Sequence, residues 1–205
     1  MYHRQSAMDI LLSDGPAAPA AGIPGLPDGP IAPKQPTDAF YATWNLLESV
    51  ADPEIPVVNL REMGILRAVR QTATGLEVVI TPTYSGCPAM SQMADDVVNA
   101  LAQAGVAARV LTQIAPAWST DWMTPEARDK LRAYGIAPPH SCASAGTNVI
   151  QFASKKIAGD AELTVACPQC GSTNTTETSH FGSTACKALY RCLSCLEPFD
   201  YFKPY

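Results

Sequence analysis

The sequence of 205 residues lacks any apolar run long enough to cross a lipid bilayer, which takes about 20 consecutive apolar residues in a helix. It also lacks an export signal, because Asp9 interrupts the short apolar patch in MYHRQSAMDILL and no long hydrophobic segment follows. These two absences predict a soluble, cytoplasmic protein. In that compartment cysteine thiols stay reduced, which disfavours disulfides.

Basic residues and histidines are also scarce. Lys and Arg number 14 against 19 Asp and Glu, so the formal net charge is −5 and the pI is near 5.1. A protein that grips phosphate backbones carries a basic excess, and we therefore expect no nucleic acid partner. The three histidines are His3, His140 and His180. None lies between residues 37 and 137, where a cysteine nucleophile would need a base, so we expect no catalysis.

Composition divides the chain into four regions. Residues 1–36 are rich in Pro, Ala and Gly and have too few large apolar groups to offset the entropy of ordering, which predicts a disordered leader. The prolines from Pro24 to Pro36 recur every third residue, a spacing that also suits a polyproline II docking strip. Residues 37–137 have the pattern of a folded domain, 138–160 that of a linker, and 161–205 carry paired cysteines.

The middle region predicts an α+β domain in which helices cover a small mixed sheet. Helical spacing and capping residues indicate one helix from Thr37 or Asp38 to just before Pro53, a second from Pro88 to Gly105, and a third from Pro125 to about Tyr134. Residues 64–72 and 76–83 predict a hairpin with its turn at Gly75, and residues 109–114 predict a further strand.

Two C-x-x-C motifs, CPQC and CLSC, are the strongest sign of chemistry in the chain. They contain Cys167, Cys170, Cys192 and Cys195. Each motif can turn two sulfurs toward one centre, and four thiolates complete a tetrahedral zinc site with no open position for a substrate. We therefore expect a C-terminal zinc-ribbon module over 161–205 whose metal is structural. An iron-sulfur cluster could use the same four thiolates, so zinc and iron both stay open here.

Three further cysteines have less certain roles. Cys87 lies in TPTYSGCP, and with Pro88 as the first helical residue it would sit at a helix cap, where the helix dipole favours the thiolate. It could equally be a small buried hydrophobe. Cys186 could compete as a ribbon ligand, but we expect it to be only a neighbour of that site. Cys142 forms an isolated His-x-Cys with His140, a weak signal.

The run DPEIPVVNLREMGI, followed by TPTYSGCP, resembles the SufT-like family of iron-sulfur assembly domains. The later segments PAWSTDWMTPEARDKLRAYGIAPP and FGSTACKALYRCLSCLEPFDYFKPY resemble accessory proteins of the phenylacetyl-CoA ring epoxidase. The resemblance covers about residues 40–205. It implies a non-catalytic protein that assists the assembly of iron or iron-sulfur centres in the oxygenase or its reductase, either as a monomer or as a homodimer.

The resemblance also implies site residues. Cys87 would handle a labile iron ion or iron-sulfur cluster, with Asp52 and Glu54 as companions, while the four ribbon cysteines would hold zinc. The aromatic tail would face the oxygenase or fill the ribbon's own core, and Trp118 and Trp122 would likewise recognise a partner or plug the domain; the tail comprises Phe199, Tyr201, Phe202 and Tyr205. Two alternatives remain, a structural subunit without labile metal and a Cys87-dependent thioester enzyme.

Overall fold

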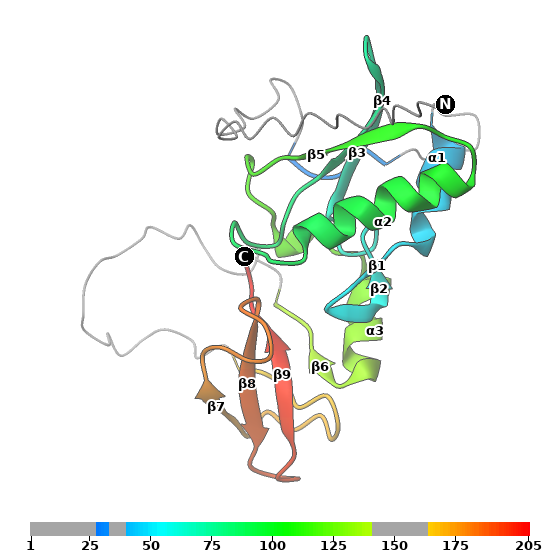
Figure 1. The fold of residues 1–205 in the computed structure, drawn as a ribbon. Helices are drawn as coiled ribbons and strands as arrows, with labels where there is room; N and C mark the ends of the chain where they lie inside the picture. The colour runs from blue at the N-terminus through cyan, green and yellow to red at the C-terminus, as the bar shows by residue number, and fades with distance from the viewer. Residues whose placement is uncertain (1–27, 33–39, 141–163) are drawn as a thin grey trace, which may run out of the picture.

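The computed structural model describes residues 28–32, 40–140 and 164–205. Most of the predicted leader and linker lies outside this part of the chain, together with Thr37, Asp38 and Cys142. The described residues form helices and three small sheets in an α+β arrangement, as the sequence predicted (Figure 1). None of the described helices combines the length and the apolar character that a membrane span requires.

The first elements are a short helix and a short hairpin. Helix α1 (Tyr41–Leu46) continues into a 3-10 turn (Leu47–Ser49), with Trp44 and Leu47 buried. The helix ends earlier than the predicted limit before Pro53, because the chain is already in a strand at Ala51. The chain then forms β1 (Ala51–Asp52) and β2 (Ile55–Asn59), which pair antiparallel. Asp52 Oδ1 accepts the backbone N–H of Glu54 at 2.8 Å, so this side chain shapes the turn between the two strands.

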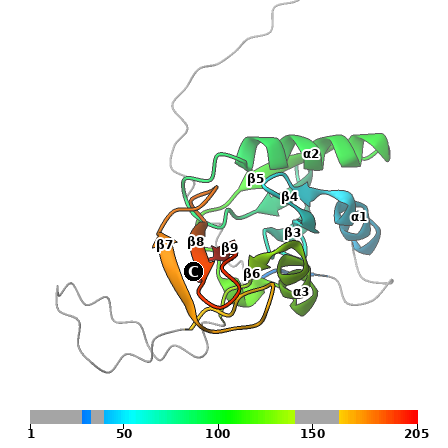
Figure 2. The ribbon, with the colours of Figure 1, turned by 90° about the horizontal axis from the view of Figure 1, so that it is seen from below.

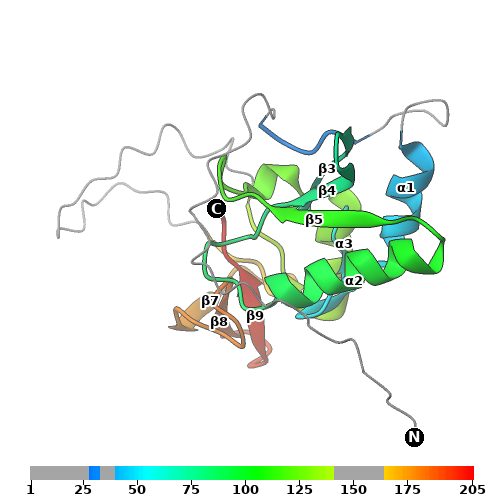
Figure 3. The same cartoon turned by 45° about the horizontal axis from the view of Figure 1, so that its top comes forward.

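A three-stranded sheet forms the centre of the domain. Strands β3 (Leu66–Thr72) and β4 (Gly75–Ile80) form the predicted hairpin, and β5 (Ala108–Thr112) pairs with β4 in parallel. Parallel neighbours need a long crossover, which helix α2 (Met90–Gln103) supplies as it runs alongside β5 (Figure 3). Its buried Met93, Val97 and Leu101 lie in the main core, as their spacing predicted.

Helix α3 leads from the domain into the C-terminal sheet. After a 3-10 turn (Thr120–Trp122), α3 (Pro125–Tyr134) begins with the Thr124 hydroxyl accepting the Ala127 N–H at 3.2 Å and ends at a left-handed Gly135. Strand β6 (Ile136–Ala137) follows directly. It pairs in parallel with β9 (Pro198–Phe202). On its other side β9 pairs antiparallel with β8 (Lys187–Cys192), which pairs antiparallel with β7 (Thr175–Ser179) at the edge of the sheet.

Apolar packing also joins the two parts of the chain. Phe202 and Cys186 from the C-terminal part belong to the main core. Trp118 is buried there, with its ring centroid 5.9 Å from that of Phe202 and its Nε1 donating to the Met63 carbonyl at 3.0 Å. Phe199 and Tyr201 instead fill a second, smaller core. Most of the aromatic tail therefore stabilises the fold, and only Tyr205, 39% exposed, leaves a large apolar surface open.

Gly64 makes a close approach that a side chain would disrupt. Its φ is +71°, and an added Cβ would lie 2.6 Å from Trp122 Cβ. We expect Gly64→Ala to lower the free energy of unfolding by about 2–5 kcal/mol, of which about 1–2 comes from the left-handed backbone and about 1–3 from overpacking. Urea denaturation measures this loss.

Gly105→Ala is the matched control for that substitution. Its φ is +74°, but no atom lies within 4 Å of the added Cβ, so it should lose only the backbone contribution of about 1–2 kcal/mol. Equal losses in the two variants would contradict a packing role for Gly64.

Candidate functional site

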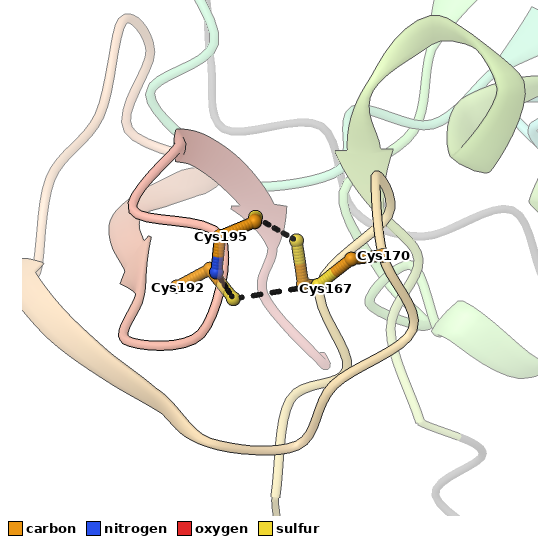
Figure 4. A group of neighbouring side chains, drawn as sticks. All are labelled: Cys167, Cys170, Cys192 and Cys195. Atoms are coloured by element: carbon orange, nitrogen blue, oxygen red, sulfur yellow. Dashed lines mark hydrogen bonds between the residues drawn. The ribbon is translucent and has the colours of Figure 1, made fainter.

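The sulfurs of the two C-x-x-C motifs converge on one point. The ligand atoms of Cys167, Cys170, Cys192 and Cys195 all lie within 4.8 Å of one another (Figure 4). The Sγ atoms of Cys167 and Cys195 are 3.8 Å apart, and those of Cys170 and Cys192 are 3.6 Å apart. Four sulfurs at about 2.3 Å from a tetrahedral zinc ion are about 3.8 Å from each other. The donor set and its spacing therefore fit zinc.

Two similar turns place these sulfurs. Residue Gly171, four positions after the first cysteine of its motif, has a φ of +74°, and Leu196, at the same position of the second motif, has a φ of +68°. In the first turn the Gly171 N–H donates to the Cys167 carbonyl at 2.9 Å, and in the second a backbone N–H group faces a sulfur. The Cys195 N–H donates to Cys192 Sγ at 3.4 Å, and this hydrogen bond is the main cause that lowers the pKa of Cys192 to about 6. The thiolate form of Cys192 is thus favoured. At Cys195 a hydrogen bond from the Glu197 N–H is outweighed by burial and the neighbouring thiols, which raise its pKa to about 12.

Cys87 does not lie at a helix cap, so that prediction is wrong. Helix α2 begins at Met90 with Ala89 as its N-cap, and Pro88 precedes the helix. The reason is a tight turn in which the Cys87 N–H donates to the Tyr84 carbonyl at 3.2 Å, so the first helical residue comes later. Burial raises the pKa of Cys87 to about 11 and outweighs a hydrogen bond from the Ala89 N–H. At neutral pH Cys87 is therefore a thiol.

The resemblance implies Asp52 and Glu54 as companions of Cys87, and the charges of both carboxylates act on that thiol. Both carboxylates, from the turn between β1 and β2, contribute to raising the pKa of Cys87. Asp52 is itself only 5% exposed, and burial raises the pKa of both carboxyl groups. Desolvation and the like charge of the neighbours therefore disfavour ionisation of all three side chains. A bound cation would favour their ionised forms.

Two further residues of this neighbourhood come from the C-terminal part of the chain. Cys186 lies in the main core instead of the four-sulfur cluster. Burial is the largest cause that raises the pKa of Cys186, and the charges of Glu54 and Asp52 also raise it. Lys187 is buried with its Nζ 3.4 Å from Asp200 Oδ2. The sequence predicts Cys186 only as a neighbour of the zinc ligands and carries no motif that singles out Lys187. No local pattern links either residue to the distant Glu54.

Two family models match the chain. The PaaD zinc beta ribbon domain matches residues 151–203, which include the four clustered cysteines. The model described as iron-sulfur cluster assembly protein matches residues 42–112, which include Asp52, Glu54 and Cys87. The two groups of candidate residues therefore fall in two different family domains.

One curated relative covers nearly the whole chain. It is an Escherichia coli (strain K12) protein named as a subunit of a "Putative 1,2-phenylacetyl-CoA epoxidase", 47% identical over 178 residues, which are 84% of this chain and 95% of the relative. Among solved structures, a domain of unknown function DUF59 from Bacillus anthracis is 26% identical, with a TM-score of 0.41, over 44% of this chain and 88% of that one. A Mycobacterium tuberculosis protein described as associated with Fe-S complex assembly and repair is also 26% identical, with a TM-score of 0.29, over 52% of this chain and 98% of that one.

The raised pKa of Cys87 predicts how its alkylation depends on pH. Since only the thiolate reacts, and burial places the pKa of Cys87 at about 11, the rate with iodoacetamide should be low at pH 7.5 and rise about tenfold per pH unit through pH 10. Mass spectrometry of the peptide that contains Cys87 gives the rate. N-acetylcysteine, with an ordinary pKa of about 8.5, should level off near pH 9 in the same buffers. If the alkylation rate of Cys87 instead reached its plateau below pH 8, the raised pKa would be contradicted and the thiolate predicted from the sequence would be supported.

Loss of one ribbon cysteine should release the metal and unfold the C-terminal sheet. In Cys192→Ser, purified protein should contain no zinc, and residues after about 165 should become sensitive to protease, because metal binding to such sites supplies on the order of 10 kcal/mol. Elemental analysis and limited proteolysis check both effects. Cys186→Ser is the comparison, since its sulfur is not in the cluster and zinc should be retained. Loss of zinc in Cys186→Ser would mean that Cys186 is itself one of the zinc ligands.

Proposed function

The chain belongs to the PaaD family, and from this premise we propose that it assists the assembly of iron or iron-sulfur centres in a phenylacetyl-CoA ring-epoxidising oxygenase or in its reductase. The E. coli relative is named as a subunit of the epoxidase, which supports the pathway. The match of residues 42–112 to an iron-sulfur cluster assembly protein supports the activity. The observation that carries the proposal is that Cys87, Asp52 and Glu54 all lie inside that matched domain, where both carboxylates act electrostatically on the thiol.

The iron ion or cluster is cargo, which binds and leaves, so its site must differ from the ribbon site. Cys87 is a protonated thiol at neutral pH because burial raises its pKa to about 11. It has to release a proton to the solvent as the iron-sulfur bond forms, and that proton competes with the metal. Carboxylates from Asp52 and Glu54 would add harder oxygen ligands. A site with these properties binds iron weakly enough to transfer it.

The ribbon would have the opposite role. Four thiolates close the coordination shell of a zinc ion, so this metal would hold residues 164–205 in shape and take no part in transfer. The ribbon and the domain pack on one core through Phe202 and Trp118. We propose that this rigid unit contacts the oxygenase and the reductase as a monomer or as a homodimer.

A structural subunit without labile metal is the second candidate. It is favoured by the packing of Cys87 against the main core, which is also how an inert cysteine would lie. A thioester enzyme has less support, because a nucleophilic thiol needs an adjacent base. Of the histidines in the described part of the chain, His140 packs on Tyr201 and His180 on Phe181 and Glu177, all in or beside the ribbon.

Anaerobic reconstitution separates the first two candidates. Zinc-loaded protein incubated with Fe(II) and sulfide, then desalted, should retain iron, and Cys87→Ala should bind iron at least about tenfold more weakly because it lacks a direct ligand. Elemental analysis of iron and zinc in the same sample measures the uptake. Zinc content and melting temperature should be equal in the two proteins, which shows that the fold is intact. Equal iron uptake by both would instead support the structural subunit.

A further inference from the structure

The candidate iron site lies at the contact between the two family domains. The loop that leads into α2 and carries Cys87 lies beside the loop that precedes β8 and carries Cys186, as two perpendicular views show (Figures 1 and 2). Cys186 is 3% exposed and belongs to the main core against which Cys87 packs. A residue of the ribbon therefore reaches the site of the assembly domain.

Hydrogen bonds fix the position of Cys186. Its carbonyl accepts the Lys203 N–H at 3.0 Å, and its Sγ is 3.0 Å from the Thr184 hydroxyl oxygen. The preceding carbonyl, of Ala185, accepts the Tyr205 hydroxyl at 3.5 Å. The thiol is therefore held in place by β9 and the C-terminal residues before any ligand binds.

Ionisable groups act on one another around Cys186. Burial is the largest cause that raises the pKa of Tyr84 to about 12, and the nearby groups of Cys87, Glu54 and Cys186 raise it further. Lys187, also buried, acts electrostatically on Asp52 and Glu54. Buried charged and polar groups cost folding free energy unless they are paired. A cluster of them around two thiols in one neighbourhood is typical of a binding site.

We propose that Cys186 is a second thiol ligand for the iron cargo, so that the labile site is shared between the assembly domain and the ribbon. This inference rests on the proposed function and deepens it. Two sulfurs with one or two carboxylate oxygens form a mixed soft and hard set that suits Fe(II). Each thiol loses its proton to the solvent as its bond to iron forms, and no oxidation or reduction is required.

These groups have to approach one another for the site to form. Among the described residues, the four ribbon cysteines are the one group of three or more acidic, histidine or cysteine ligands gathered closely enough to hold an ion. Iron binding must therefore draw the turn at Asp52 and Glu54 and the Cys87 loop toward Cys186. The free energy of that movement is subtracted from the affinity, which suits a carrier that has to release its cargo.

Iron K-edge X-ray absorption tests the inference directly, because the iron edge does not report on the zinc site. The sample is full-length, zinc-loaded protein with one equivalent of Fe(II), prepared anaerobically. We expect two iron-sulfur bonds in the wild type and one in either Cys186→Ser or Cys87→Ser. Cys186→Ser should also weaken Fe(II) binding at least about tenfold in competition with a chromophoric chelator.

Ser183→Ala is the matched control, because Ser183 lies in the same loop as Cys186, is exposed and donates a hydrogen bond to the Asp200 carboxylate. The Ser183→Ala protein should bind Fe(II) like the wild type. One sulfur in wild-type spectra, with binding lost only in Cys87→Ser, would overturn the role of Cys186 and leave the proposed function standing. Absence of Fe(II) binding by the wild type would overturn both. Wild-type spectra count the sulfurs even if Cys186→Ser fails to fold.

Discussion

The short pairing of β6 with β9 fixes how the two halves of this protein meet. Only Ile136 and Ala137 form β6, yet they add to β9 at Asp200 and Tyr201 and make the end of α3 continuous with the ribbon sheet. Parallel pairing of so few residues is weak by itself, and the packing of Trp118 on Phe202 stabilises it. Because β9 is held in this way, the loop with Cys186 lies against the assembly domain. The shared neighbourhood of the thiols and carboxylates depends on this docking.

The two groups of cysteines differ in what surrounds the sulfur. In the ribbon, turn N–H groups point at the sulfurs and lower the pKa of Cys192, so that the anionic ligand is favoured before the metal arrives. Around Cys87, burial and then the carboxylates raise the pKa, so that the neutral thiol is favoured. A metal at the ribbon would meet four sulfurs within 4.8 Å of one another, of which Cys192 favours its anionic form, whereas a metal bound by Cys87 would have to displace the proton of a buried thiol.

Local sequence patterns predicted the features that depend on residues a few positions apart. The helix from Pro125 to Tyr134 and the hairpin near Gly75 are of this kind, and so are the two halves of the four-cysteine cluster. The start of α2 was misplaced because the turn from Tyr84 to Cys87 ends before a helix can begin. The pKa of Cys87 was misjudged because burial is set by packing across the whole domain. The sequence predicts Cys186 only as a neighbour of the ribbon ligands, whereas docking through β6 and Phe202 places it in the main core, and no periodicity encodes contacts between such distant segments.

One strand connects the two metal environments. Strand β8 begins at Lys187, beside Cys186, and ends at Cys192, a ligand of the four-sulfur cluster. At about 3.4 Å per residue, these ends are roughly 17 Å apart, too far for an ion to pass directly from one set of sulfurs to the other. A metal at the four-sulfur cluster would therefore act on the surroundings of Cys186 through the position of β8, whose Lys187 pairs with Phe202 of the main core in β9. The proposed thiol ligand at the other end of this strand lies outside the four-sulfur cluster.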